Sequence, residues 1–413
     1  MDNAFRLITL LCLSRIVRVF TDIQRIEIDR KYSALAKSAC GERIREMLES
    51  HPLIQPDLDK LWLTGTVYNK AASVIYRLAC WYMWFEDEYG EESTNKTLSK
   101  YLSGHSVRTT FCVWVYGIKP EQRFDFEGIS IVPINDMPKS RERSEYLDLI
   151  SKHESPVSYC AIVKEQDIPR IVECDKEANK VHSELVNSSY VEISDLALLV
   201  NALSDLSCLP NWRCSSQQDL VPFGPWSTSG RSSVCFDIVG NHSRAFSQGH
   251  GVELNQVYKS YKGLSGGKKA WLNTILDRIR KSKRQQSIEN KVLDLGIAAE
   301  MLLLRDLTEN DPISFPFRFR GSWLLGNDFD SRKSIHRTLK NFYGYRCAIA
   351  HEGAFKKEKD IKEVQEMLPE LYDIVEKIFK RAVLSSYPSK SDEWLELILG
   401  NKECGYSSKC SEA

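Results

Sequence analysis

A chain of 413 residues is too long for one ordinary hydrophobic core, so two or three domains are expected. Its hydrophobic fraction of 42% and aromatic fraction of 10% are values of globular proteins, and they exclude a disordered chain. Lysine and arginine number 56, as do aspartate and glutamate. This balance does not exclude a nucleic-acid partner, because a local basic face can be offset by acidic surface elsewhere.

The N-terminus and the cysteines both indicate a cytoplasmic chain without a membrane anchor. The apolar run Leu7–Leu13 follows Asp2, has arginines close by and lacks a small-residue cleavage site, so an amphipathic helix is expected and not a signal peptide. No run reaches the roughly 20 apolar residues that cross a bilayer. The 12 cysteines are scattered singly, without the spacing of metal ligands or of a redox motif, which favours reduced thiols.

Residues 1–108 are expected to be helical. Apolar residues recur at three- and four-residue spacing in two segments, Tyr32–Leu48 and Leu61–Glu86. The region is also rich in aromatic side chains, which we expect to form a packed core and not a binding surface: Trp62, Trp81, Trp84 and Phe85.

The residue pattern changes at Thr109, and residues 109–262 are expected to form a mixed α/β domain. Helical periodicity predicts helix over 178–206, and the Pro, Gly and Ser content predicts a loop over 210–230. Runs of β-branched and aromatic residues predict strands at 110–116, 124–133 (interrupted by Gly128), 157–163 and 234–239.

Three glycines, Gly263, Gly266 and Gly267, mark the start of an almost entirely helical region, residues 266–400, before a flexible tail, 401–413. The stretch from Gly263 to Lys269 superficially resembles a phosphate-binding loop, but its glycine spacing is wrong and no strand precedes it, so it is expected to be a flexible linker. Helices are expected at 269–284, 287–305, 319–325, from Asp330 or Ser331 to His351, at 358–384 (with Pro369 inside) and at 392–399. The expected fold is mostly α, with a mixed α/β middle region and a C-terminal helical bundle.

Arg346 and His351 are the residues most suited to chemistry. They are separated by a small apolar spacer near the end of a predicted helix, with Gly353 as a plausible terminating residue. Residues five apart lie about 140° apart around an ideal helix, so the two side chains converge only if the histidine is at the helix terminus. An imidazole can move the 2′-hydroxyl or leaving-group proton of RNA, and a guanidinium can stabilise the phosphorane charge. Taken alone, the pair also fits a helix-end histidine and a surface arginine without function.

The sequence around this pair resembles the HEPN superfamily, and more narrowly the ApeA-like HEPN domain of bacterial anti-phage proteins. The stretch Phe342-Tyr-Gly-Tyr-Arg-Cys-Ala-Ile-Ala-His-Glu-Gly353 is similar to the family pattern Leu-Tyr-Asp-Leu-Arg-Ser-x, two hydrophobic residues, His-Gly. Upstream, Leu293-Asp-Leu-Gly-Ile-Ala-Ala-Glu-Met-Leu-Leu303 and Arg320-Gly-Ser-Trp-Leu-Leu-Gly326 resemble two further family elements in the same order. Trp271–Gln286 looks like the opening helix of the family.

The resemblance implies a helical bundle that dimerises so that two Arg/His sets meet in one cleft. It implies that Arg346 and His351 are catalytic in a metal-independent endoribonuclease that needs no cofactor. Three positions depart from the family pattern. Gly344 replaces an acidic residue, which puts the stiffness of the helix in doubt, Cys347 stands where serine is common, and Glu352 displaces the following glycine by one position.

Three further residues are candidates for a supporting role at the site. Glu300 either supports the Arg/His pair or is a buried acid paired structurally with an arginine such as Arg320. Arg320 belongs to the second family element. Tyr343 either orients the site or fills the core.

A basic run ends the helix predicted at 269–284. Lys281, Lys283 and Arg284 belong to it, with Asp277 the only acid among the cations from Lys268 onward. These residues are candidate RNA contacts, because several share one helical face where attraction to phosphates would be additive. The other interpretation is an ordinary solvated helix face.

The functional expectation is a cytoplasmic, homodimeric RNA-cutting protein of bacterial anti-phage defence, acting on tRNA or mRNA and thereby arresting growth (abortive infection). The strand, glycine turn and strand over Val113–Ile131 loosely resemble a region that often precedes the HEPN module, which implies a sensor with a possible phage-derived trigger. The alternative is a non-catalytic RNA-binding or dimerisation module regulated by the N-terminal region.

Overall fold

The computed structural model describes residues 32–137, 159–217, 230–231 and 243–400, except positions 33, 65, 204–205, 309–310, 356 and 386. The expectations for residues 7–13, 234–239 and 401–413 lie outside this part of the chain. The chain forms two compact units, residues 1–194 with 210–245, and residues 195–209 with 246–413. The longer segment of the second unit therefore starts at Phe246 and includes the helix before the glycines of 263–267, which packs against a helix of that unit.

The N-terminal part of the first unit contains a β-hairpin where only helix was expected. Its helices are α3 (Ala39–Glu49), α4 (Ala71–Tyr89) and α5 (Glu91–Ser103). Between α3 and α4, β1 (Leu61–Thr64) and β2 (Val67–Lys70) pair antiparallel. The predicted helix from Leu61 to Glu86 is thus wrong in its first ten residues or so. A run as short as Leu61-Trp-Leu-Thr64 fits a helix or a strand equally well, and pairing of β1 with β2 and with β8 (Ile171–Val172) decides for the strand.

The aromatic residues of this region form core, as predicted. Trp62 and Phe85 are almost fully buried, and Trp81 is nearly so. Trp84 is half-buried, with its ring edge-on to Phe85. The guanidinium of buried Arg170 lies over the Trp62 ring and donates to the carbonyl oxygens of α5's last turn, so the charge has internal partners.

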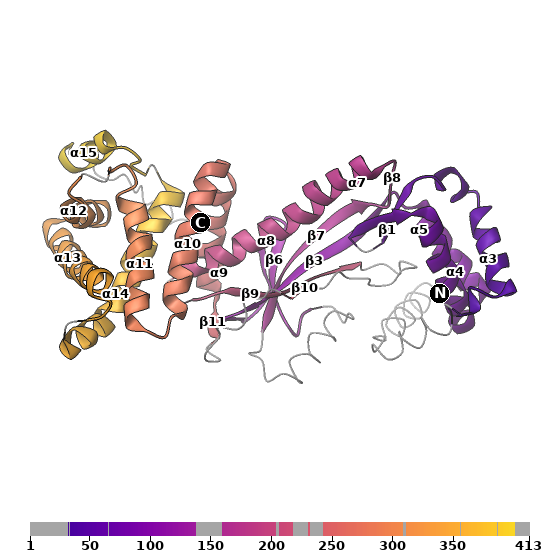
Figure 1. The fold of residues 1–413 in the computed structure, drawn as a ribbon, viewed down its shortest axis with the longest axis horizontal. Coiled ribbons are helices and arrows are strands. Elements are labelled where there is room, and N and C mark those ends of the chain that lie inside the picture. The colour runs from indigo at the N-terminus through magenta and orange to yellow at the C-terminus, as the bar shows by residue number, and fades with distance from the viewer. Residues whose placement is uncertain are drawn as a thin grey trace, which may run out of the picture. The chain divides into compact units, whose positions relative to one another are not determined.

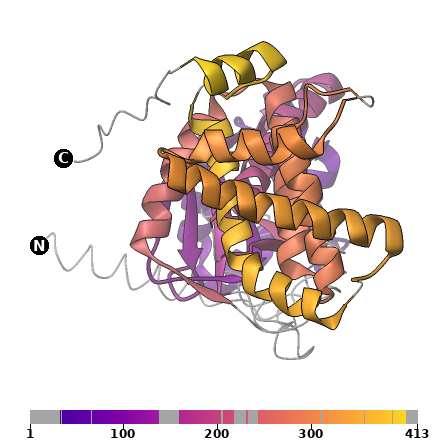
Figure 2. The same ribbon diagram turned by 90° about the vertical axis from the view of Figure 1, so that its left-hand side faces the viewer.

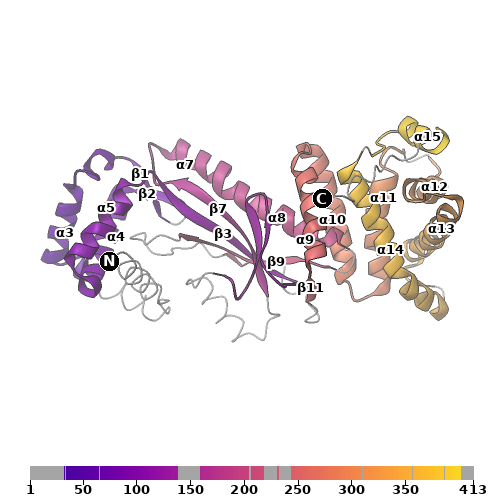
Figure 3. The same cartoon turned by 180° about the vertical axis from the view of Figure 1, so that it is seen from behind.

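A six-stranded sheet forms the centre of the first unit (Figures 1 and 3). Its strands, in spatial order, are β10 (Gly230–Arg231), β9 (Leu209–Gln217), β3 (Ser106–Tyr116), β7 (Cys160–Pro169), β6 (Ile129–Pro133) and β5 (Phe124–Phe126). Glu127 and Gly128 both have positive φ, which is the two-residue hairpin turn between β5 and β6. The loop predicted from Pro210 is wrong as far as Gln217, because β9 pairs with β3, and proline is tolerated near the start of a strand.

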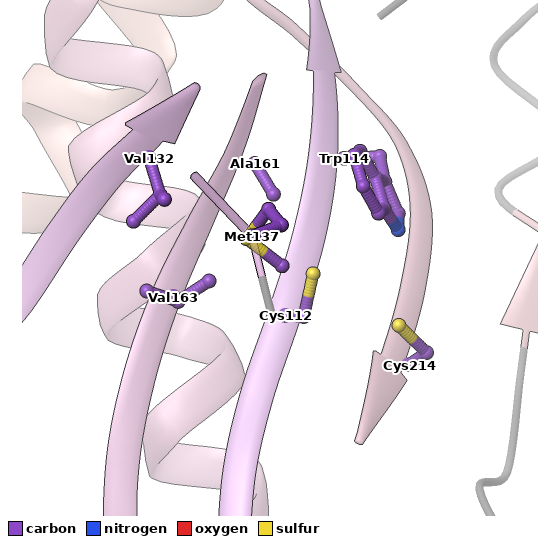
Figure 4. Close-up of a cluster of buried hydrophobic side chains, with 7 residues drawn as sticks. All are labelled: Cys112, Trp114, Val132, Met137, Ala161, Val163 and Cys214. Atoms are coloured by element: carbon purple, nitrogen blue, oxygen red, sulfur yellow. The ribbon is translucent and has the colours of Figure 1, made fainter. Parts of the chain in front are cut away.

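Each face of the sheet is covered differently. On one face, Cys112 and Trp114 of β3 pack with neighbours from β6, β7 and β9, and Figure 4 labels this cluster: Cys112, Trp114, Val132, Met137, Ala161, Val163 and Cys214. The other face lies under a continuous helical segment, made of α7 (Asp175–Val181), a π-helical turn (His182–Asn187) and the start of α8 (Ser188–Leu199). Phe111 contacts Tyr190 edge-on at 5.2 Å between ring centroids. A small ladder, β4 (Ile118–Pro120) with β11 (Arg244–Phe246), completes the strands.

The second unit is helical, as the sequence predicted, and Figure 2 faces it. Its elements are η3 (Val200–Ala202), α9 (Gln248–Lys262), α10 (Gly266–Arg284), α11 (Ile288–Leu303), α12 (Ser314–Leu325), α13 (Phe329–Glu352), α14 (Glu358–Leu384) and α15 (Ser391–Leu399). Helix α11 is central, since it packs against α10, α12, α13 and α14. Helices α12 and α13 run side by side (Figure 2). No helix in the described ranges is both long and apolar enough to cross a membrane.

The helix starts in this unit differ from the expected ones by a few residues. Helix α10 begins at Gly266, where the Ser265 side chain accepts from the Lys268 amide, so the expected linker is reduced to the turn around Gly263. Helix α13 is capped by Asp328, two or three residues before the predicted cap (Asp330 or Ser331), in a reciprocal capping box with Ser331. The predicted capping residue is therefore wrong, although a polar N-cap at this point of the chain was expected.

Candidate functional site

Helix α13 carries both Arg346 and His351, and it ends where the candidate site requires. Glu352 is its last residue, and Gly353 adopts a left-handed conformation with φ of 78°. The Gly353 amide donates to the Ile349 carbonyl oxygen at 2.8 Å. This is the glycine C-cap that the sequence predicted, and it places His351 in the final turn, at the negative end of the helix dipole.

The two side chains leave α13 on different faces. Arg346 shares its face with Phe342 and Ile349, which are buried against the rest of the unit. His351 is exposed, and it forms no hydrogen bond or ion pair with the side chains that the structure describes. The separation agrees with the roughly 140° expected for residues five apart on a helix. Within one chain, therefore, the arginine faces inward and the histidine faces solvent.

A close approach between α11 and α13 holds Arg346. The Arg346 Nη2 donates to Glu300 Oε2 at 2.8 Å. One turn earlier on α11, a Cβ added at Gly296 would lie 2.8 Å from Arg346 Cγ, so only glycine leaves room for the arginine stem to cross α11 here. Sequence reasoning missed Gly296, although an isolated glycine inside a strong helical pattern is a known signal of close packing.

The Glu300–Arg346 pair is partly shielded from water. The side chains are 20% and 23% exposed, respectively. Burial raises the pKa of Glu300, and the neighbouring Arg346 opposes this shift through its charge and its hydrogen bond. Glu300 Oε1 and Arg346 Nε are buried and form no hydrogen bond with the described residues. The pair is therefore incompletely satisfied, and the unpartnered Arg346 Nε is shielded from solvent.

Tyr343 and Cys347 complete this cluster. The Tyr343 ring packs on Phe317 at 5.1 Å between centroids. The pKa of Tyr343 is raised to about 12, chiefly by burial and also by Cys347 and Glu300, while the charge of Arg346 opposes this shift. The sequence left open whether Tyr343 orients the site or fills core. In the structure Tyr343 is half-buried, its ring packs on Phe317, and it lies near Glu300 and Arg346.

Arg320 lies elsewhere, in the core. Its guanidinium contacts both carboxylate oxygens of Asp306, at 2.6 and 2.9 Å, and donates to the Leu303 carbonyl oxygen at 2.7 Å. It also lies 4.9 Å from the centre of the Trp394 ring. The suggested pairing of Glu300 with Arg320 is therefore wrong, since Glu300 pairs with Arg346. Arg320 joins α12 to the end of α11 and to α15.

The basic run of α10 is not one exposed face, and the expectation that Lys283 contacts RNA is wrong. The Lys283 side chain is 8% exposed and its Nζ lies 2.7 Å from Oε1 of fully buried Glu376. The same Nζ donates to the carbonyl oxygens of Asn201, Leu203 and Leu206 at 2.8 to 2.9 Å. Lys283 is therefore closed to a phosphate. Arg284 is half-buried, and Lys281 is exposed but paired with Asp277 at 2.9 Å.

Comparison with known proteins identified no relative of this chain. No family model matches the chain, and neither the curated proteins nor the solved structures gave a significant match. Over the part of the chain that the structure describes, no group of three or more His, Cys, Asp or Glu side chains is arranged to hold a metal ion. The cysteines that the structure describes are free thiols.

Proposed function

We propose that the helical unit is a metal-independent endoribonuclease of the HEPN type, with Arg346 and His351 as its catalytic residues. The observation that carries the proposal is the arrangement at the end of α13. An arginine side chain that is 23% exposed is held across Gly296 by Glu300, and an exposed imidazole lies in the last turn of the same helix. A guanidinium can stabilise phosphate charge, and an imidazole can act as a general acid or base.

The chemistry follows from these two groups. His351 removes the proton from the ribose 2′-hydroxyl, whose oxygen attacks the adjacent phosphorus in line with the leaving 5′-oxygen. Arg346 stabilises the charge of the phosphorane, and the 5′-oxygen leaves after it takes up a proton. The products are a 2′,3′-cyclic phosphate and a 5′-hydroxyl. Glu300 positions Arg346, and Tyr343 packs beside the pair.

The opposite directions of the two side chains support a dimeric enzyme. One helix surface does not offer both groups to one phosphate, so a second copy of the chain would complete the site by bringing the ends of two α13 helices into a shared cleft. The remaining unit, built on the six-stranded sheet, would then restrain the nuclease until a phage-derived trigger acts. In this proposal the protein cuts tRNA or mRNA in the cytoplasm during abortive infection.

The test is cleavage of total RNA by the purified full-length protein in EDTA. We expect cleavage by the wild type, and a loss of about 10²- to 10⁴-fold in His351→Ala, as is usual when a general acid–base group is removed. Arg346→Ala should be similarly impaired. New 5′ ends should require phosphorylation before they can be ligated, because they carry a hydroxyl.

The matched control is His182→Ala, which removes an exposed histidine from the other unit and should leave the rate unchanged. Cleavage that persists at the wild-type rate in both His351→Ala and Arg346→Ala would end the proposal.

The exposed position of His351, away from Arg346, favours one alternative, a non-catalytic RNA-binding or dimerisation module. In that case the wild type and His351→Ala would retain RNA equally and neither would cut it.

A further inference from the structure

Helices α12 and α13 present a basic and aromatic face that the sequence reasoning did not single out. Neither helix contains an acidic residue except Asp330 and Glu352, near the two ends of α13. Three cations of α13 are exposed, Lys333, Arg337 and Lys340. None of them forms an ion pair with a side chain in the described part of the chain. Their positive charge is therefore directed at solvent.

These cations form a stripe that leads to His351. At 3.6 residues per turn, Lys333 and His351 are separated by about five full turns and lie on the same line along the helix. Arg337 and Lys340 lie within about 40° of that line, and successive cations are about 6 and 4.5 Å apart along the axis. Between Lys340 and His351 the stripe contains Gly344, where an added Cβ would have no heavy atom within 4 Å. Along α13, this surface therefore starts with three cations, continues with Gly344, which has no side chain, and ends at the imidazole of His351.

Aromatic rings flank this stripe on α12. Phe315 is 53% exposed and stacks on Phe319, with centroids 4.8 Å apart and planes 22° apart. The Arg318 guanidinium lies 5.7 Å from the centre of the Phe315 ring. Helix α12 packs against α13, and the pKa of His336 on α13 is lowered first by burial and then by the charge of Arg318 on α12.

We propose that the α12–α13 face binds single-stranded RNA, with phosphates on Lys333, Arg337 and Lys340 and bases stacked on Phe315 and Phe319. Unpaired cations at helical spacing attract a phosphate backbone, and exposed rings stack on bases that are not already paired. A duplex buries those base faces, so the rings favour a single strand. The inference rests on the proposed function and deepens it, because it names the surface on which the same unit holds its RNA.

The test measures binding and not cleavage, in full-length His351→Ala protein so that RNA stays intact. Fluorescence anisotropy with a short labelled oligouridylate, titrated over a range of salt concentrations, gives the affinity and its salt dependence. The test variant replaces Lys333, Arg337 and Lys340 with glutamine. The matched control replaces Lys359, Lys362 and Lys377, exposed lysines of α14 in the same unit, and thus removes the same charge.

We expect the α13 triple variant to lose at least about tenfold in affinity and its salt slope to fall by about 2, since each lost contact to a single strand contributes about 0.7. The α14 triple variant should bind like its parent. Phe315→Ala with Phe319→Ala should weaken binding of the single strand by about fivefold or more. The same variant should leave the weaker binding of an RNA duplex unchanged.

Equal binding by the two triple variants would overturn the inference. So would an α13 triple variant that binds RNA normally but changes mass in light scattering, because the face would then be an interface between copies. Unchanged binding by the double phenylalanine variant would overturn the stacking part. Selective loss of binding in the α13 triple variant, in a protein whose wild type never cuts RNA, would support this inference while the nuclease proposal fails.

Discussion

Helices α10 and α13 of the second unit each carry a run of basic residues, and the two runs differ in how their side chains are packed. In the run at the end of α10, Lys283 is directed inward, where it meets buried Glu376 and three carbonyl oxygens, while Lys281 is exposed but paired with Asp277. The run in the first half of α13 is directed outward, where Lys333, Arg337 and Lys340 meet water. Local composition is nearly the same in both. The difference teaches that charge density along a sequence does not identify a binding face until the packing of the helix is known.

The largest effect is expected at Lys283, the buried cation of the α10 run. Lys283→Ala should destabilise the protein by about 3–5 kcal/mol, because it leaves the Glu376 carboxylate buried without its cation. Lys340→Ala, on the exposed stripe, should change the free energy of unfolding by no more than about 0.5 kcal/mol. Urea unfolding monitored by circular dichroism measures both.

A second variant controls for the cause. Lys283→Met combined with Glu376→Leu should recover most of the lost stability, since an apolar pair of similar volume often replaces a buried ion pair at little cost. A loss below about 1 kcal/mol in Lys283→Ala would show that the α10 run is as exposed as that of α13.

An intermediate effect is expected on the inward face of α13, where Arg346 crosses α11. Gly296→Ala places a Cβ 2.8 Å from Arg346 Cγ, so the arginine must shift away from Glu300. Overpacking costs about 1–3 kcal/mol, and the better helix propensity of alanine offsets about 0.5–1 kcal/mol of it. We expect a net loss near 1 kcal/mol in urea unfolding. A gain in stability would mean that the arginine stem does not occupy the space beside Gly296.

The smallest expected effect lies on the outward face of the same helix. A Cβ at Gly344 meets nothing within 4 Å, and its φ is not positive. Gly344→Ala should therefore stabilise the protein by about 0.5–1 kcal/mol through the lower entropy of the unfolded chain. Gly353→Ala is the contrasting variant, because the left-handed backbone at φ of 78° should make it destabilising by about 1–2 kcal/mol. Thermal melting of the two variants should shift in opposite directions.

Long periodic helices were predicted well, as were the strands β3, β5 and β6 with their break at Gly128, but β1 and β9 were missed. The helix predicted at 358–384 is α14 with the same bounds, since nearly eight turns of amphipathic pattern outweigh even Pro369. In contrast, β1 lies where a helix was predicted and β9 where a loop was predicted, and pairing makes each a strand, β1 with β2 and β8, and β9 with β3 and β10. Gly296 was missed for the same reason, since its role is set by Arg346, fifty positions later on another helix.

The sequence alone determined where α13 ends and that an arginine and a histidine lie near that end, because capping and helical period are local properties of the backbone. Only the tertiary structure decided where each charge is directed. It turned Arg346 toward Glu300, Lys283 toward Glu376 and Arg320 toward Asp306, and it left the stripe from Lys333 to His351 in solvent. The physical reason is that burial and ion pairing depend on which helices meet, and that choice is made by residues far apart in the chain.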